Sequence, residues 1–595
     1  MENYKVLKSG TDIRGRAIEH DGKPAVLTDK AVGDLASAFI CWLRDSLGKT
    51  ELKIAMGRDS RLTGEHFSRV IVKKLRFSNL EFFDCGMIST PTAYMLTQFP
   101  TMKVDGSIML TASHHPYDIN GIKFFTAEGG VNSRQLDEII ARAERGESSD
   151  VSKHSTILRK DGLRLYCDML CDVIRKGTGN FKPLKDMKIV VDAGHGAGGF
   201  FATRVLQPLG ADVSESQFLE PDGNFPAHAP NPENPDAMDS LKNKVLESGA
   251  DLGVIFDADV DRCAVVSSDG TEINRCSFIA LASAMVLPNH PGATIVTDSV
   301  TTEGLRKFIE SRGGHQKRFR RGYRNVIDEA KRLISEGVDV PLAIESSGHA
   351  AFADNYFLDD GAYFIARLLV EYAKLRADGH SLTDMIADLH TPLEEADIRL
   401  DLIGYDWRDT VEKIIPRLSA LSERILKIPD ESYEGIRAYI QHAHGYFIVR
   451  ASVHDPVLPI YIEADKEGGA LSVAKFLYSF LKGFRGVDCA PLVDFIAEAE
   501  EVLAYNRAAK EAEEEEGEEE YEEYEDDVDD EAEPAENPQE VYDDNSSYEE
   551  QPEELYDNTD TYAAQPEGVY DDGGYTAQPD DVQYQGIDTE GTDEF

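Results

Sequence analysis

The sequence lacks any hydrophobic run long enough to cross a membrane. Its longest apolar stretch, residues 278–287, is much shorter than the roughly 20 residues that a transmembrane helix requires. The start of the sequence, Met1 to Lys5, shows no hydrophobic region of a signal peptide. We therefore expect a cytoplasmic protein with no membrane partner.

Cysteine is scarce and shows no pairing pattern. The seven cysteines are odd in number, scattered, and without a Cys-x-x-Cys pair. This argues against a disulfide framework and against a zinc site. Cys167 and Cys171 stand four residues apart in a helix-like stretch, where a packed pair is the simpler interpretation. The pattern is typical of a reduced protein.

Positive charge is missing from the end of the chain. Of the 110 acidic residues, 36 lie between Glu511 and Phe595, where there is no Lys or Arg. The net charge of −49 over 595 residues therefore describes this end, because the first 510 residues carry 74 acidic and 61 basic side chains, a net of −13. An acidic body argues against a nucleic-acid partner, since nucleic-acid backbones are bound by clustered Lys and Arg.

Residues 513–595 form a low-complexity segment with nine tyrosines and three related motifs that begin at Gln551, Gln565 and Gln578. This acidic composition cannot bury enough apolar surface to offset the entropy of ordering. We predict a disordered acidic tail. It either solvates the protein or carries docking motifs or tyrosine modification sites, and the sequence does not identify its partners.

Repeated strand-then-helix units occupy most of the remaining chain. Short apolar runs at residues 52–56, 252–256 and 342–344 end in Gly, Asp or Glu, and helical periodicity follows several such runs. This alternation predicts α/β layers with functional loops at the carboxyl ends of the strands. From about residue 395 to 470 the pattern changes to that of a smaller α+β domain.

Ser113 lies in Thr111-Ala-Ser-His-His-Pro116, directly after the predicted strand 106–110. Proline ends regular pairing and restricts the residue before it, so the serine sits on a tight loop. Such a serine can carry a phosphoryl group between substrates. An ordinary turn serine is the alternative for the motif taken alone.

Three aspartates, Asp257, Asp259 and Asp261, alternate along the loop after the strand 252–256. Their oxygens converge on one point, which suits a hard cation such as Mg²⁺. A solvated acidic turn is the alternative, whereas an EF-hand would need a glycine and a distal glutamate that are absent. A cation beside a serine indicates phosphoryl transfer. No Walker A or kinase loop is present, so the donor need not be a nucleotide.

These motifs occur in an order that resembles the α-D-phosphohexomutase superfamily, most closely its phosphomannomutase/phosphoglucomutase branch, over roughly residues 1–490. The motifs that carry the resemblance are Thr111–His114, Asp257–Arg262, Glu345–His349 and Arg450–Ser452, with supporting signatures at Gly10–Gly15, Gly57–Arg61 and Pro221–Pro226. The resemblance implies three α/β mixed-sheet domains and a smaller α+β C-terminal domain around a central cleft. It also implies exchange of hexose 1-phosphate and hexose 6-phosphate, of mannose and/or glucose, through a phosphoserine enzyme. One Mg²⁺ ion and hexose 1,6-bisphosphate, as activator and intermediate, are the implied cofactors.

The expected domains follow from this resemblance and from the pattern of strands and helices. Their boundaries are 1–155 with the phosphoserine loop, 156–270 with the metal loop at its end, 271–385 with the sugar-binding loop, 386–496 with the phosphate-binding loop, 497–512 as a helical extension, and 513–595 as the disordered tail.

The resemblance also assigns roles to individual residues. The catalytic set is Ser113, Arg14, His114, Lys123 and Arg262. The metal ligands are Asp257, Asp259 and Asp261 together with the phosphate on Ser113. The substrate contacts are Arg324, Glu345, Ser347, His349, Arg450, Ser452 and His454. For His349 taken alone, a structural histidine is the simpler interpretation.

The sequence departs from the family pattern at three places. His115 stands where many members have asparagine, Ala258 and Val260 stand where glycines are common, and residues 453–455 replace the usual small polar pair. These changes leave the substrate open. Phosphoglucosamine mutase is one alternative, and a sugar-phosphate-binding scaffold acting through its acidic tail is another. The sequence leaves open whether the protein is a monomer or a dimer.

Overall fold

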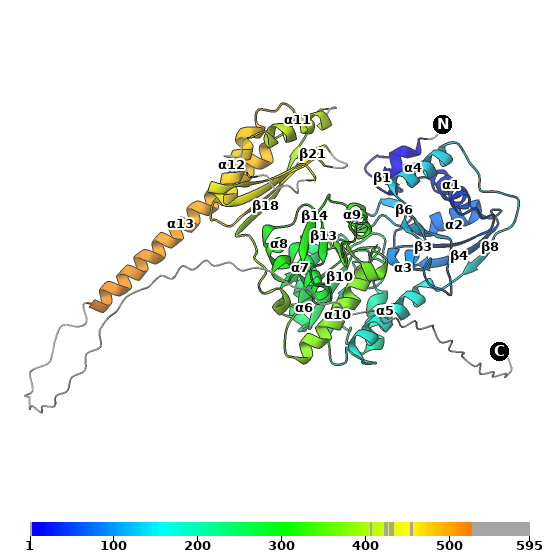
Figure 1. Ribbon diagram of the computed structural model, residues 1–595, viewed down its shortest axis with the longest axis horizontal. Coiled ribbons are helices and arrows are strands. Elements are labelled where there is room, and N and C mark those ends of the chain that lie inside the picture. Colours follow the sequence, from blue (N-terminus) through cyan, green and yellow to red (C-terminus); the bar gives the residue numbers. More distant parts are fainter. Residues whose placement is uncertain (1–2, 405–406, 422–426, 428–432, 453–455, 526–595) are drawn as a thin grey trace, which may run out of the picture. The chain divides into compact units, whose positions relative to one another are not determined.

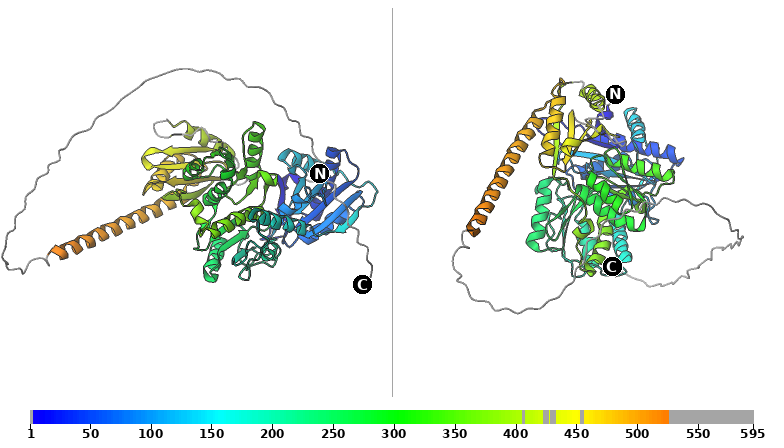
Figure 2. Two further views of the ribbon diagram at one scale, coloured as in Figure 1. Left: turned by 60° about the horizontal axis from the view of Figure 1, so that its bottom comes forward. Right: turned by 60° about the vertical axis from the view of Figure 1, so that its left-hand side comes forward.

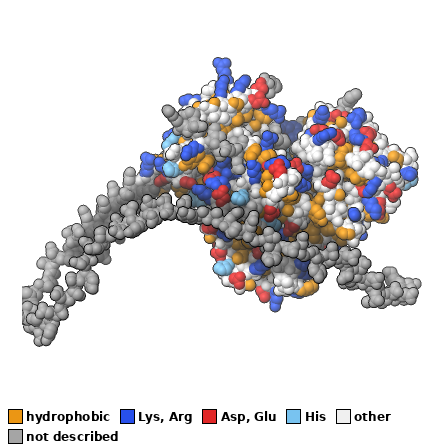
Figure 3. All heavy atoms as spheres, in the orientation of Figure 1, with side chains coloured by type: hydrophobic (Ala, Val, Ile, Leu, Met, Phe, Trp, Pro, Cys, Tyr) orange, Lys and Arg blue, Asp and Glu red, His pale blue; other side chains and the backbone are white. Residues whose placement is uncertain are grey.

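The computed structural model describes residues 3–404, 407–421, 427, 433–452 and 456–525 (Figures 1 and 2). The chain divides into two compact units, Met1–Glu516 and Gly517–Phe595. The described residues of the first unit form four β-sheets. Among the described helices, none has the length and apolar character needed to span a bilayer. Acidic and basic side chains intermingle over the face that Figure 3 shows.

The first sheet is mixed and has helices on both faces. Strand β3 pairs in parallel with β4 and β5, and β5 pairs antiparallel with β6. Helices α1, α2 and α4 pack on one face, and α3 packs on the other. The elements are β1 (Lys8–Ser9), β2 (Asp12–Arg16), α1 (Asp29–Leu47), β3 (Leu52–Arg58), α2 (Gly64–Lys74), β4 (Leu80–Met87), α3 (Thr90–Met95), β5 (Gly106–Leu110), β6 (Ile119–Thr126), β7 (Gly129–Gly130), α4 (Ser133–Glu144) and β8 (Thr156–Arg159). Because β8 pairs with β4, this sheet extends to Arg159, a few residues past the expected boundary.

The second sheet carries the expected metal loop on a tight hairpin. Its order is β12-β11-β10-β9, and the 257–262 loop joins the antiparallel strands β10 and β11. All five residues of β10 are buried, since α6 covers one face and the large central core covers the other. The elements are α5 (Gly162–Thr178), β9 (Ile189–Asp192), α6 (Pro235–Ser248), β10 (Leu252–Phe256), β11 (Cys263–Ser267) and β12 (Glu272–Ile273).

The third sheet, with strand order β14-β13-β15-β16-β17, positions the expected sugar-binding loop. This loop, residues 345–349, joins the antiparallel strands β15 and β16. Helix α9 packs on one face, and α7, α8 and α10 pack on the other. The elements are α7 (Arg275–Val286), β13 (Thr294–Thr297), α8 (Glu303–Ser311), β14 (His315–Arg318), α9 (Tyr323–Ser335), β15 (Leu342–Ile344), β16 (Ala350–Phe352), β17 (Leu358–Asp359) and α10 (Gly361–Ala377).

The fourth sheet is antiparallel, with strand order β18-β21-β20-β19, and α11 and α12 share its core. Its elements are β18 (Glu394–Asp401), α11 (Trp407–Ser419), β19 (Ile436–Ile440), β20 (Gly445–Val449), β21 (Val457–Ala464) and α12 (Gly469–Leu481). The three α/β sheets and this smaller α+β part confirm the expected fold class.

The helix α13 (Ala490–Glu525) is longer than the sequence analysis predicts. We expected a helical extension over 497–512 and a disordered tail from residue 513, but the helix starts earlier and continues through the glutamate-rich run. Glutamate is a good helix former, so low complexity alone does not end a helix there. Residues 526–595 lie outside the described residues, and with them most of the predicted tail.

Candidate active site

Ser113 lies on the loop that joins β5 to β6, as the sequence predicts. The loop holds it in the left-handed region, with φ of 51°, and the side chain is buried. Ser113 Oγ donates to Asp257 Oδ2 at 2.8 Å and lies 3.4 Å from Nδ1 of His114. The serine of the first sheet therefore meets the metal loop of the second.

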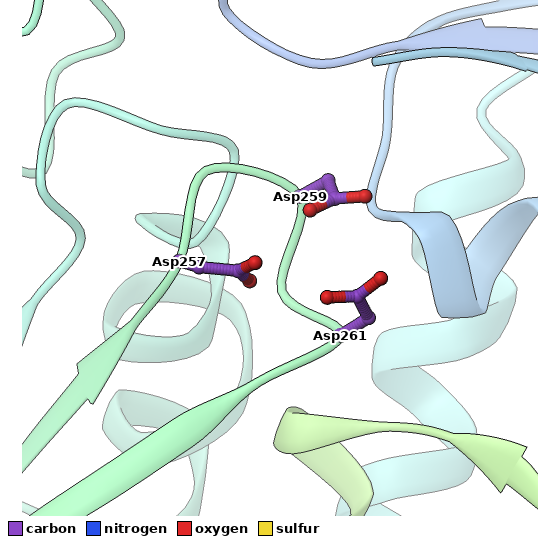
Figure 4. A group of neighbouring side chains, drawn as sticks. All are labelled: Asp257, Asp259 and Asp261. Carbon is purple, nitrogen blue, oxygen red and sulfur yellow. The ribbon is translucent and has the colours of Figure 1, made fainter. Parts of the chain in front are cut away.

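The three aspartates surround one small space at the turn between β10 and β11 (Figure 4). One carboxylate oxygen from each lies within 4.8 Å of the others, and all three side chains are buried. Val260 adopts φ of 67° in this turn. A β-branched residue there is a genuine outlier that costs about 1–3 kcal/mol. Val260 therefore holds a strained backbone conformation at a position where glycines are common in the family that the sequence resembles.

This donor set fits a divalent cation. Asp259 Oδ1 and Asp261 Oδ1 are buried and have no hydrogen-bond partner among the described residues. Burial and the charges of Asp261 and Asp259 raise the pKa of Asp257 well above its ordinary value. Buried carboxylate oxygens that repel one another and have open lone pairs are suited to a hard cation with oxygen ligands.

Lys123, on β6, bridges two of these carboxylates. Its Nζ donates to Asp261 Oδ2 at 2.5 Å and to Asp259 Oδ2 at 3.1 Å. Burial alone would lower the pKa of Lys123, but these two charges outweigh it and hold the pKa well above its ordinary value. Lys123 is therefore a cation at neutral pH in this arrangement, and it can polarise a hydroxyl or stabilise a developing negative charge.

Arg14, His114 and Arg262 complete the catalytic set that the sequence predicts. Arg14 lies on β2 and donates to Asp12 at 2.9 Å. Arg262 Nε donates to Nε2 of His349 at 3.2 Å and lies 3.8 Å from Asp257 Oδ2. Burial and the charge of Arg262 lower the pKa of His114, so its ring is neutral at physiological pH.

The 345–349 loop is buried and internally hydrogen-bonded. Glu345 accepts from the backbone N–H of Gly322 at 2.6 Å. His349 accepts from Arg262 through Nε2, so its Nδ1 carries the proton and donates to Ser347 Oγ at 2.9 Å. Burial and Arg262 keep the pKa of His349 well below its ordinary value. His349 thus orients Ser347 and Arg262, which agrees with a structural histidine.

Glu345 gives this loop a pH signature. Burial and the nearby Asp298 raise its pKa to about 8, against an ordinary value of 4.5. A raised folded-state pKa contributes stability that is complete below about pH 4.5 and is lost as the pH rises to about 8. We therefore expect the thermal midpoint of the wild type to fall relative to that of Glu345→Gln between pH 5 and 8, without metal or substrate. Parallel curves across this range would contradict the expectation.

A cavity of about 660 Å³ opens between the second, third and fourth sheets. Arg450 follows β20 and lies on its wall, with His114 and Ser346 on other parts of the lining. Arg450 also pairs with Glu434 at 3.3 Å. Ser452 is half-buried just beyond Arg450. His454, with residues 453–455, lies outside the described residues.

Arg324 does not line this cavity. Its Nη1 donates to the carbonyl of Gly130 at 3.2 Å, and Nε lies 2.9 Å from Asp328 Oδ1. It lines a separate, smaller cavity with Lys123. Asp12 and Asp261 also line this smaller cavity. The expected role of Arg324 as a substrate contact therefore stays a prediction.

Arg321 lines the large cavity together with Arg275, Arg399 and Arg450, and the sequence motifs did not single it out. Its Nη2 donates to Glu233 at 3.1 Å, and the other oxygen of Glu233 lies 3.3 Å from Arg262. Thr90 was also missed, although its hydroxyl donates to Asp259 at 2.5 Å. The only sequence signals were the pair Arg320-Arg321 before a glycine and the Ser89-Thr90-Pro91 helix start.

Comparison with known proteins identifies the family. Three models described as phosphoglucomutase/phosphomannomutase alpha/beta/alpha domains I, II and III match residues 6–150, 165–270 and 276–392. A phosphomannomutase/phosphoglucomutase of Pseudomonas putida is 31% identical over 424 residues, which cover 71% of this chain and 86% of that protein. A phosphoglucomutase of Neisseria gonorrhoeae is 30% identical, over 70% and 85% of the two chains. The chain belongs to the phosphoglucomutase/phosphomannomutase family of the α-D-phosphohexomutase superfamily.

Solved structures agree with this assignment. The crystal structure of a phosphoglucomutase/phosphomannomutase family protein from Burkholderia thailandensis has a TM-score of 0.67 at 27% identity, covering 81% of this chain and 98% of its own. The phosphoglucomutase parafusin from Paramecium, in an open form, has a TM-score of 0.61 at 15% identity, over 79% and 94% of the two chains. The second likeness concerns the fold alone.

Proposed function

We propose that this protein is a Mg²⁺-dependent phosphohexomutase that interconverts the 1- and 6-phosphates of mannose and/or glucose. The reaction passes through a phosphorylated Ser113 and a hexose 1,6-bisphosphate. The observation that carries this proposal is the hydrogen bond of 2.8 Å from Ser113 Oγ to Asp257, which joins a candidate phosphoryl carrier to a carboxylate set suited to a cation. The names of the two relatives, a phosphomannomutase/phosphoglucomutase and a phosphoglucomutase, support mannose and glucose as the sugars.

The residues divide the chemistry between two ends of the substrate. At one end, the bond between phosphorus and Ser113 Oγ breaks while phosphorus bonds to a sugar hydroxyl, whose proton is released as Ser113 regains one. Lys123, Arg14 and Arg262 supply positive charge around the transferring group. Bound at Asp257, Asp259 and Asp261, Mg²⁺ supplies further charge neutralisation of the phosphoryl oxygens.

The other end of the substrate holds a phosphate that does not react in that step. Arg450 and Arg321 both line the cavity, and an arginine fork suits a phosphate dianion. Glu345 and Ser347 are the proposed sugar-hydroxyl contacts between the two ends, with Ser452 and His454 beside Arg450. A serine can serve both C1 and C6 if the bisphosphate turns over between the two half-reactions.

The direct test is isomerisation by the purified full-length protein. Mannose, glucose and glucosamine 1-phosphates are each assayed with Mg²⁺ and a trace of the matching 1,6-bisphosphate, and kcat/KM is compared. We expect the highest value for mannose or glucose. A highest value for glucosamine would identify a phosphoglucosamine mutase, and no turnover of any sugar would favour a scaffold. Removal of residues 513–595 tests whether the tail takes part in the reaction, because the mutase proposal predicts unchanged activity without it.

Arg321 and Arg320 offer a matched pair of variants. We expect Arg321→Met to raise KM for the hexose phosphate about 10–100-fold, because one charge-assisted phosphate contact is worth about 1.5–3 kcal/mol. Arg320→Met removes the same charge from the neighbouring residue, which is exposed and lines neither cavity, so its KM should stay within about twofold of the wild type. Steady-state kinetics of both variants measure the difference. Equal effects would place the phosphate site elsewhere.

The seven cysteines are all free, two of them as the buried Cys167 and Cys171 on α5. The reduced state of these thiols and the cytoplasmic location stay predictions, as does the choice between monomer and dimer.

A further inference from the structure

Two signatures identified in the sequence, Gly57–Arg61 and Pro221–Pro226, have no role in the mechanism above. In the structure they contact each other, and Arg61 of the first signature also contacts the Ser113 loop. Arg61 follows β3, and its side chain is completely buried. The 221–226 loop precedes α6 in the second α/β part of the chain. The contact between the two signatures includes Arg61, which is hydrogen-bonded to the backbone of Ser113.

Arg61 donates hydrogen bonds to four backbone carbonyl groups, three in the Ser113 loop and one at Ile119, where β6 begins. Its Nη2 donates to the carbonyls of Ser113 at 2.5 Å and His115 at 2.6 Å. Its Nη1 donates to those of Pro116 and Ile119, both at 2.7 Å. A planar guanidinium is the side chain that can reach four acceptors from one fixed position. The loop conformation is therefore formed around this group.

Asp59 connects Arg61 to the amide side of the same loop. Its Oδ2 lies 3.2 Å from Arg61 Nε and accepts from the hydroxyl of Thr111 at 2.7 Å. The backbone N–H of Ser113 in turn donates to that threonine oxygen at 2.9 Å. Both sides of the Ser113 peptide are thus fixed while the residue holds its positive φ, a conformation that costs free energy unless its surroundings impose it.

The 221–226 loop closes over Arg61 from the other side. The Phe225 ring lies 5.3 Å from the guanidinium carbon, and Phe225 itself is held at φ of 50°. At Gly223 a side chain would meet the carbonyl of Ser60 at 2.5 Å and the amide of Leu62 at 2.6 Å, so the two backbones are in direct contact. An aromatic ring over a buried cation stabilises it where no water can.

The same loop is tied to the metal loop. The amide of Asp222 donates to the carbonyl of His195 at 2.9 Å, and two residues later the amide of Ala197 donates to the carbonyl of Ala258 at 2.8 Å. At Gly196 a side chain would lie 2.7 Å from Cα of Ala258. A continuous chain of close contacts therefore runs from the aspartate loop through residues 195–197 and 222–225 to Arg61.

We propose that Arg61, covered by Phe225, is a positioning residue that holds the Ser113 loop in register with the metal loop. Arg61 touches neither the cleft nor the reacting atoms. It acts through the four carbonyls, so that Ser113 Oγ stays within reach of Asp257 in every turnover. This inference rests on the proposed function for its kinetic consequence, whereas the clamp itself is independent of that function.

The test compares Arg61→Lys with Arg58→Lys, a control in the same signature that bonds to the carbonyl of Asp59 instead. Lysine keeps the charge opposite Asp59 but cannot span four carbonyls. With enzyme well below its thermal midpoint, we expect Arg61→Lys to lower kcat about 10–100-fold with KM within about threefold, and Arg58→Lys to change neither beyond about twofold. Amide hydrogen exchange of residues 113–121 should accelerate in Arg61→Lys and stay unchanged in Arg58→Lys.

Phe225→Leu provides the second variant in case Arg61→Lys does not fold. It keeps the apolar cover and removes the ring face, and we expect kcat to fall about three- to tenfold with KM unchanged. In the variant that combines Arg61→Lys with Phe225→Leu, the decrease in kcat should be smaller than the product of the two single decreases, because the ring acts through Arg61. Unchanged kcat and exchange in these variants, in an active wild type, would overturn the proposal. If the wild type has no mutase activity, accelerated exchange in Arg61→Lys or Phe225→Leu supports the clamp, and unchanged exchange refutes it.

Discussion

Replacing Ser113 by alanine is expected to lower kcat at least about 10³-fold, because loss of a covalent nucleophile removes the reaction path and not one contact in it. The substitution also removes the donor to Asp257. KM should change little, since Arg321 and Arg450, the proposed contacts of the distal phosphate, remain in place. Phosphate transfer from a hexose 1,6-bisphosphate to the protein, followed by mass spectrometry of the 113 peptide, should be abolished.

The control for this variant is Ser335→Ala, at an exposed serine near the end of α9. It should retain activity within about twofold, as surface substitutions usually do. Wild-type activity in Ser113→Ala would refute the phosphoserine mechanism, and label found on another residue would move the nucleophile there.

The second large effect concerns the aspartate loop. We expect Asp257→Asn to lower kcat at least about 10²-fold while it raises the thermal midpoint of the metal-free protein, since it removes one of three buried charges that repel one another. Mg²⁺ at 100 times its Kd should stabilise the wild type by about 2.7 kcal/mol. The variant should lose most of this response. Thermal unfolding with and without Mg²⁺ measures the metal-free midpoint and the Mg²⁺ response, independently of catalysis. Steady-state kinetics measure kcat.

Asp239→Asn is the matched control, because Asp239 is exposed on α6 and lies outside the aspartate loop. It should leave the metal response unchanged. A full Mg²⁺ response in Asp257→Asn, or none in the wild type, would show that the three aspartates do not hold the ion.

Elements that depend on neighbours in sequence were predictable. The strands at 106–110, 252–256 and 342–344 were each expected at the residues where they occur. Their apolar runs are short and bounded by turn residues, so residues close together in the sequence specify both the burial of the strand and its end. The three aspartates occupy a single hairpin turn, which explains why their grouping was readable from spacing alone.

Contacts between distant segments were not predictable. Arg321 lines the large cavity, whereas Arg324 lines the smaller cavity with Lys123, and the basic stretch that holds both arginines carries no signal for this difference. The length of α13 was also misjudged, because composition predicts the absence of a core but not the absence of a helix.

The sequence by itself determined the fold class, the family and the local motifs at Ser113, Asp257–Asp261, Glu345 and Arg450. Only the tertiary structure decided which side chains meet: Ser113 with Asp257, Lys123 with Asp261, and Arg61 with Phe225. The physical reason is that hydrophobic periodicity and turn residues act over a few positions. The pairing of buried charges is set by the packing of separate sheets, which brings together residues more than 100 positions apart.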